Sequence, residues 1–306
     1  MIAEFNKVVT GIKNLHIQGA ENVAKEASKS LKCVVRNSKA TKKDGLLSEL
    51  NAAVKKLIST RPTEPAMRNA LKYIFLNIKG ENVTEISKEI YKKIDEITKH
   101  FEDSNRIIGA FGKKKIKNDF IVFTHCHSST VVSLLIKAKK VGKNFEVHNT
   151  ETRPLFQGRK TASELAKENI AVTHYIDSAS MLAMKKADIC LFGADAIQSD
   201  GRVINKIGTG LFTEIANKHD IPVFCCMNSW KFDPLTIWGD DERIENRPKK
   251  EVWATNTKNI EIENPAFEVI EPQKITGIIS ELGIYHPDVF SEIARRHYPW
   301  LLESID

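Results

Sequence analysis

Two side chains that can transfer protons each follow an apolar run typical of a buried strand. Cys126 follows the run at 120–124, and Asp195 follows the run at 189–194. Ligands of an open α/β sheet bind beyond the carboxyl ends of its strands, so both side chains are candidates for one site. A thiol and a carboxylate can together carry out the proton transfers of an isomerisation. Whether the two form a pair therefore decides between an enzyme and a binding module.

Hydroxyl side chains follow Cys126 where a helix is predicted to begin. Ser128, Ser129 and Thr130 open the predicted helix that runs to residue 140. Such residues cap helices, and the free amide groups of a helix N-terminus attract anions. The same helix end can lower the pKa of a neighbouring thiol. We therefore expect Cys126 to reach the thiolate form near neutral pH, although a single cysteine is more typical of a small buried hydrophobe.

Polar groups suited to phosphates and hydroxyls follow other predicted strands. They lie in the loop 150–159, which contains Gln157, at Asn205 and Lys206, and at Lys231. Guanidinium and amide groups of the loop can donate to a sugar phosphate, and the alternative is a salt-bridged structural loop. Gly208 and Gly210 allow close approach of the backbone to a ligand. Asp195 has its own alternative, an ordinary aspartate in a turn.

His125 and His127 flank Cys126 and raise the question of a metal ion. Successive side chains of a strand face opposite ways, so a His-Cys-His triplet has poor spacing for a shared ligand set. The sequence holds no second Cys/His cluster to complete a zinc site. We expect neither a metal nor another cofactor.

The elements that must position these residues change character near residue 118. Before it, apolar residues recur every three or four positions, which indicates helices, in 21–35, 48–60 and 83–101. After it, short apolar runs alternate with amphipathic helices, which favours a parallel sheet covered by helices. The predicted fold is α/β, with a helical N-terminal domain at 1–117 and a Rossmann-like, mostly parallel sheet domain at 118–306. The tail at 275–299 is expected to form a final helical cap.

The composition is that of an ordinary globular protein. Among 306 residues, 42% are hydrophobic and 28% are charged, and no apolar run approaches the ~18 residues of a membrane span. Five cysteines without C-x-x-C pairs or a secretory signal fit a reducing cytoplasm. The net charge of +7 suits phosphorylated metabolites. Nucleic acid is not expected, because the lysine run at 113–115 has no interleaved aromatic residues.

Four segments in their order resemble the signature segments of a known superfamily. They are the segments at 124–130, 151–162, 193–210 and 229–234. This superfamily joins the regulatory subunits of translation initiation factor 2B with sugar-phosphate isomerases. The resemblance covers nearly the whole chain, including the helical half, and is greatest to the archaeal ribose-1,5-bisphosphate isomerases.

The resemblance implies a role for each matching residue. Cys126 and Asp195 would be the catalytic pair, which the regulatory subunits generally lack. The implied contacts to phosphate and sugar are Gln18, Gly19, Ala20, Glu21, Arg61, Ser128, Ser129, Thr130, Gln157, Asn205, Lys206 and Lys231. The family's first phosphate loop is typically R-G-A-G, so Gln18 removes a cation and Glu21 adds an anion here. His127 stands where the family usually has asparagine.

The resemblance favours an aldose–ketose isomerase that converts ribose 1,5-bisphosphate to ribulose 1,5-bisphosphate in the breakdown of AMP. A thiolate at Cys126 would remove the C2 proton while Asp195 acts on the ring oxygen. The implied assembly is a cytoplasmic homo-oligomer, a dimer or a hexamer, without membrane partners. One alternative is a non-catalytic regulatory subunit that binds a sugar phosphate or nucleotide. Another is methylthioribose-1-phosphate isomerase, which requires an apolar pocket.

Overall fold

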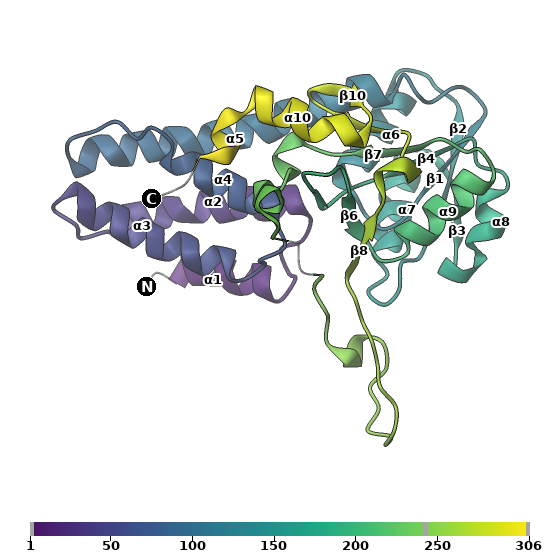
Figure 1. Cartoon of the computed structure of the whole chain (residues 1–306), viewed down its shortest axis with the longest axis horizontal. Coiled ribbons are helices and arrows are strands. Elements are labelled where there is room, and N and C mark those ends of the chain that lie inside the picture. The colour runs from purple at the N-terminus through teal and green to yellow at the C-terminus, as the bar shows by residue number, and fades with distance from the viewer. Residues whose placement is uncertain (1–2, 241–243, 304–306) are drawn as a thin grey trace. The chain divides into compact units, whose positions relative to one another are not determined.

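The computed structural model describes residues 3–240 and 244–303, which belong to two compact units (Figure 1). The helical unit contains the chain up to residue 103 and from residue 295 onward, and the α/β unit contains residues 104–294. One long helix, α5, carries the chain from the first unit into the second. The predicted division into a helical domain at 1–117 and a Rossmann-like domain at 118–306 stays a prediction.

Helices form the first unit, as the three- and four-residue spacing predicts. They are α1 (Ala3–Lys13), α2 (Ala20–Asn37), α3 (Lys43–Ile58), α4 (Pro65–Phe75) and α5 (Val83–Gly112). Helix α2 contacts α1, α3 and α4, and the first three helices lie side by side in Figure 1. Leu31, Leu50 and Leu57 are fully buried between them. Pro65 begins α4 because its fixed φ suits the first helical position, where no backbone donor is needed.

A seven-stranded sheet forms the centre of the α/β unit, in the order β10-β9-β7-β4-β1-β2-β3. Its strands are β1 (Phe120–Thr124), β2 (Phe145–Thr150), β3 (Ala171–Tyr175), β4 (Ile189–Phe192), β7 (Val223–Cys226), β9 (Gly277–Ser280) and β10 (Gly283–Tyr285). Only the β9–β10 pair among them is antiparallel. The predicted α/β class with a mostly parallel sheet is therefore confirmed.

Helices and short 3₁₀ turns lie between the strands and after the last of them (Figure 1). The helices are α6 (Ser129–Lys140), α7 (Gln157–Lys167), α8 (Ser180–Met184), α9 (Thr209–Lys218) and α10 (Pro287–His297). The 3₁₀ turns are η1 (Asp177–Ala179), η2 (Ser229–Lys231), η3 (Pro234–Trp238), η4 (Lys249–Glu251), η5 (Pro272–Lys274) and η6 (Pro299–Leu302). Val122, Leu134, Val147 and Leu191 share the buried core between sheet and helices.

The order of the strands places a topological switch point between β1 and β4. From β1 the chain passes to β2 and β3 on one side, and then returns to place β4 on the other side of β1. Val122 and Phe123 of β1 pair with Ile189 and Cys190 of β4. Ligands of open α/β sheets bind at such a point, beyond the carboxyl ends of the strands.

A second, smaller sheet follows β4. It is antiparallel and consists of β5 (Ala196–Ile197), β6 (Val203–Lys206) and β8 (Phe267–Ile270). Residues 244–265 precede β8 and extend from it as a long loop (Figure 1). The base of this loop is closed by backbone hydrogen bonds, from Arg247 to Asn264 and from Ala266 to Glu245.

The prediction for the tail was wrong in its first half. Residues 277–285 form β9 and β10, and the helix begins only at Pro287. Ile278 and Ile279 pair with β7 of the central sheet, where β-branched side chains pack well. Their pairing with a distant strand outweighs the local helical spacing. Among residues 3–240 and 244–303, no helix is both long and apolar enough to cross a membrane.

Candidate active site

The switch point brings the two predicted catalytic residues to one edge of the sheet. Cys126 lies just beyond β1, and Asp195 lies just beyond β4, the neighbouring parallel strand. The backbone N–H of Asp195 donates to the carbonyl oxygen of Ile204 at 2.8 Å, which ties this turn to β6. Burial is the main cause that raises the pKa of the Cys126 thiol, and the negative charge of Asp195 adds to this effect. The charge of Asp195 therefore acts on the thiol.

The thiol of Cys126 is protonated at neutral pH, contrary to the expected thiolate. Burial raises its pKa to about 12, and the positive charge of Lys206 opposes this effect only in part. Helix α6 does begin nearby, and the side chain of Ser128 caps it by accepting from the N–H of Val131 at 3.4 Å. Removal of the thiolate from water outweighs the attraction of the helix end.

His125 joins the end of β1 to two other segments. Its Nε2 lies 2.9 Å from the carbonyl oxygen of Ile207, and its Nδ1 lies 2.6 Å from the hydroxyl oxygen of Thr150. A carbonyl oxygen only accepts, so we assign the hydrogen to Nε2 and the acceptor role to Nδ1. Burial lowers the pKa of His125 to about 4, which keeps the ring neutral. The ring therefore fastens the loop after β6 to the strand that carries Cys126.

The two glycines of that loop contact protein groups. A Cβ at Gly208 would lie 3.0 Å from Nε2 of His125, and its φ of 104° favours glycine. The N–H of Gly210 donates to a carboxylate oxygen of Glu268 at 2.9 Å. The two glycines thus approach His125 and Glu268, because the pairing of β6 with β8 carries Glu268 to the start of α9. Their approach to a ligand stays a prediction.

Buried cations lie on the same edge. Lys206 and Lys231 are 7% and 8% exposed, so each ammonium is largely withdrawn from water. Nζ of Lys231 donates to the carbonyl oxygen of Ala194, directly before Asp195. Asn205 donates through Nδ2 to the hydroxyl of Thr209 at 3.0 Å, so part of its amide is used within the fold. The two lysines supply positive charge suited to a phosphorylated ligand.

The hydroxyl residues at the start of α6 differ in their surroundings. Ser129 is exposed, whereas the Thr130 hydroxyl donates to Oδ1 of Asn105 at 3.2 Å. A Cβ at Gly193 would lie 2.8 Å from Cβ of Ser128, so glycine is needed for the end of β4 to approach α6. Thr130 has a structural partner, and Ser129 is the more accessible of the two.

Gln157, at the start of α7, holds a buried acceptor that is not satisfied. Its Oε1 has no hydrogen-bond partner among the residues that the structure describes. A buried polar atom without a partner is costly, and a hydroxyl group of a ligand would satisfy it. The nearby Arg159 stacks on the Phe156 ring at 3.7 Å and lies 3.4 Å from Glu151, as the salt-bridged alternative for this loop predicts.

The remaining predicted contact residues belong to the helical unit, and their partners are given for that unit alone. They are Gln18, Gly19, Ala20, Glu21 and Arg61. Glu21 stands in the first turn of α2 and pairs with Lys25 at 2.9 Å. Arg61 pairs with the buried Glu64 at 2.9 Å. Both side chains thus have partners within their own unit.

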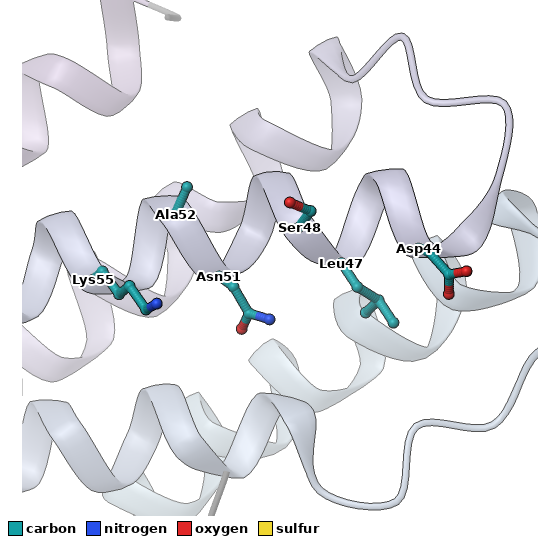
Figure 2. A pocket seen from close by; sticks show the side chains of 6 residues that line it. All are labelled: Asp44, Leu47, Ser48, Asn51, Ala52 and Lys55. Carbon is teal, nitrogen blue, oxygen red and sulfur yellow. The ribbon is translucent and has the colours of Figure 1, made fainter. Parts of the chain in front are cut away.

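The described residues offer no metal site, and a hollow lies in the helical unit. No three His, Cys, Asp or Glu side chains among the described residues could share a metal ion. A hollow of about 480 Å³ runs along one face of α3, lined by Asp44, Leu47, Ser48, Asn51, Ala52 and Lys55 (Figure 2). It contains none of the predicted site residues.

Sequence reasoning missed two polar residues that follow strands of this sheet. Asp177 follows β3, and Glu281 follows β9. Glu281 accepts from the N–H of Ser229 at 3.1 Å, and burial raises its pKa. The rule that selected Cys126, a polar residue within two positions of a strand end, would have found both.

The sheet and its switch point define an open α/β protein, a class whose ligands bind at that point. The chain belongs to the initiation factor 2 subunit family, whose model matches residues 16–287. It is 36% identical to ribose 1,5-bisphosphate isomerase of Thermococcus kodakarensis, over 99% of this chain and 97% of that protein. With such relatives, the chain is an isomerase enzyme of this family.

Solved structures agree with the fold. Translation initiation factor eIF-2B of Pyrococcus horikoshii superposes with a TM-score of 0.83 at 25% identity, covering 94% of this chain and 98% of that one. The 5-methylthioribose 1-phosphate isomerase of the same organism gives a TM-score of 0.80 at 26% identity, covering 97% and 88%.

Proposed function

We propose that the chain converts ribose 1,5-bisphosphate to ribulose 1,5-bisphosphate, with Cys126 and Asp195 as its acid–base pair. The observation that carries this proposal is their position beyond adjacent strands on the two sides of the switch point. The similarity to the Thermococcus isomerase supports the substrate. The buried lysines Lys206 and Lys231 and the unsatisfied oxygen of Gln157 fit a ligand with phosphates and hydroxyls. We place the reaction in the breakdown of AMP.

The phosphate on C1 determines the chemistry. It prevents the ring from opening to a free aldehyde, so the bond from C1 to the ring oxygen must break as the C2 proton leaves. The thiolate of Cys126 takes the C2 proton while the carboxylic acid of Asp195 protonates the ring oxygen. The product of this step is an enol phosphate with a C1–C2 double bond. Asp195 then removes the enol proton and Cys126 returns a proton to C1, which gives the ketose.

The pair holds one proton throughout this cycle. It begins as thiolate and carboxylic acid, and the first step turns it into thiol and carboxylate. Burial raises the pKa of the Cys126 thiol to about 12, so in the resting structure the proton of the pair lies on sulfur. Transfer of that proton from Cys126 to Asp195 yields the reactive form. Because this transfer takes no proton from solvent, we expect kcat/KM to be level with pH across neutrality.

The test is turnover of purified protein with ribose 1,5-bisphosphate, measured as formation of the ketose bisphosphate. Cys126→Ser should lower kcat by ~10²–10⁴-fold, the usual contribution of a positioned acid or base, with little change in KM. Cys33→Ala, a change at a cysteine of the helical unit, is the matched control and should keep full activity. Full activity of Cys126→Ser would contradict the proposal.

The same assay separates the other candidate functions. Turnover of methylthioribose 1-phosphate alone would assign the activity of the second solved neighbour. Tight binding of ribose 1,5-bisphosphate without turnover would assign a sensor of sugar phosphates. Either result would replace the proposed reaction.

A further inference from the structure

The backbone at Cys126 has an unusual conformation. Its φ is 64°, in the left-handed region that residues other than glycine rarely adopt. Such a conformation persists only where the surroundings hold it, and it is common at functional sites. The direction of the Sγ atom depends on this φ, because the side chain turns with the backbone that carries it. The groups that hold the Cys126 backbone therefore determine where the thiol points.

Two buried hydroxyl groups hold the peptide groups on either side of Cys126. Its N–H donates to Oγ1 of Thr152 at 3.0 Å, and its carbonyl oxygen accepts from Oγ1 of Thr161 at 2.8 Å. Thr152 is 0% exposed and Thr161 is 1% exposed, so water cannot replace either partner. The two threonines come from different elements, the turn after β2 and helix α7.

Thr152 is itself fixed by a third strand end. Its φ is also 64°, and its N–H donates to Oδ1 of Asp177 at 2.9 Å. The other oxygen of Asp177 accepts from the N–H of Arg153 at 2.7 Å. Asp177 follows β3, so bonds between neighbouring turns link the ends of β3, β2 and β1. The position of Cys126 thus depends on three strands.

Thr161 is fixed by the side chain of His127. Nδ1 of His127 lies 3.1 Å from Oγ1 of Thr161. The Thr161 hydroxyl already donates its hydrogen to the Cys126 carbonyl, so we assign a hydrogen to Nδ1 and let the hydroxyl oxygen accept it. His127 is the residue that departs from the usual asparagine. His127 therefore supports Thr161, which in turn holds the backbone of Cys126.

We propose that Thr152 and Thr161 are positioning residues for the reaction of Cys126. They hold its peptide groups so that Sγ stays aligned with the substrate carbon and with Asp195, and the Thr152 hydroxyl also lies 3.3 Å from Nδ1 of His125. This inference rests on the proposed function, in which Cys126 transfers the proton. Misplacement of a reacting group by about 1 Å can lower a rate by about 100-fold. Substrate binding depends on other side chains and should change little.

The test removes each hydroxyl without changing the size of the side chain. Thr152→Val and Thr161→Val should each lower kcat by about 10- to 100-fold, with KM within about threefold of the wild type. Thr152→Ser and Thr161→Ser keep the hydroxyl and should restore kcat. Thr98→Val is the control, since its hydroxyl bonds only within α5, to the Ile94 carbonyl at 3.2 Å. Should Thr152→Val not fold, Thr161→Val carries the test from a separate helix.

Alkylation of Cys126 by iodoacetamide gives a second measurement that needs no substrate. The valine variants should react faster than the wild type at pH 8, because the thiol leaves its fixed, half-buried position. Folded valine variants with wild-type kcat and wild-type alkylation would overturn the inference. An equal loss of kcat in the serine variants would also overturn it, since the hydroxyl would then be irrelevant. A wild type without turnover would refute the proposed function, and the alkylation rates alone would then decide the positioning role.

Discussion

The raised pKa of Cys126 leads to a prediction about how its reactivity varies with pH. Only the thiolate reacts with iodoacetamide, so the alkylation rate follows the thiolate fraction. Cys126 is half-buried and the other four cysteines are buried, so it is the thiol that the reagent reaches in the folded protein. With a pKa of about 12, its alkylation rate should rise tenfold per pH unit from pH 7 to pH 10 without levelling off.

The size of the effect combines two opposing factors. At pH 7 an unperturbed thiol with a pKa of about 8.5 is about 3% thiolate, whereas a thiol with a pKa of about 12 has about one thiolate in 100,000. The ratio of these fractions is about 3,000. A thiolate of higher pKa is also more nucleophilic, here by about 40-fold for a Brønsted coefficient of about 0.45. Cys126 should therefore react about 80-fold more slowly at pH 7 than the same residue in the urea-unfolded chain.

The assay is mass spectrometry of the alkylated protein over time, with circular dichroism to show that it stays folded at each pH. Lys206→Met should slow the reaction further, because Lys206 is the charge that lowers the pKa of Cys126. Lys218→Met removes an exposed lysine at the end of α9 and should leave the rate unchanged. A rate that levels off below about pH 8.5 would refute the reasoning, since burial would then not suppress the thiolate.

Three further predictions concern the surroundings of the site. Gly158→Ala should lower the free energy of unfolding by about 1–3 kcal/mol in urea denaturation, because the alanine Cβ would lie 1.7 Å from the Thr150 carbonyl oxygen. A variant more stable than the wild type would contradict this close packing of Gly158 against Thr150. Gln157→Leu removes a buried oxygen that has no hydrogen-bond partner, so it should raise the free energy of unfolding by about 1 kcal/mol. It should also raise KM, because a substrate hydroxyl would donate to that oxygen. An unchanged KM would exclude that contact. His125 has its pKa lowered by burial to about 4, so below pH 6.5 the unfolded chain binds a proton that the folded protein refuses. The neutral ring therefore contributes about 3 kcal/mol to the free energy of unfolding above pH 6.5, and this is lost as the pH falls to about 4. If His125→Gln lost stability in acid as steeply as the wild type in urea denaturation, this reasoning would be contradicted.

The placement of Cys126 and Asp195 at one edge of the sheet could be predicted from the sequence because the signal is local. An apolar run followed by a polar residue indicates the end of a strand, and Cys126 and Asp195 both satisfied that rule. Parallel strands bring such ends to one edge, so the site required only the correct strand order. The helices of the first unit were likewise readable from the spacing of their apolar residues.

The protonation state and several contacts could not be predicted, because they depend on distant parts of the chain. The pKa of Cys126 reflects burial by the folded unit, which outweighs the helix end visible in the sequence. The N–H of Gly210 meets Glu268 only after β6 pairs with β8. In the same way, the local spacing of apolar residues predicts a helix at 277–280. The segment forms a strand because it pairs with β7, which lies far away in sequence.

The switch point also determines when the thiol is vulnerable to oxidation. Cys126 leaves the ribosome before β2, β3 and β4 exist, so during synthesis it is an ordinary exposed thiol without its threonine partners or Asp195. Oxidants attack thiolates, and an unperturbed cysteine presents far more thiolate than the folded site does. Once the sheet is complete, the folded site keeps the Cys126 thiol protonated and so slows its oxidation. Folding therefore protects Cys126 from oxidation by the same burial that keeps it protonated, and the newly made chain is the form most exposed to damage.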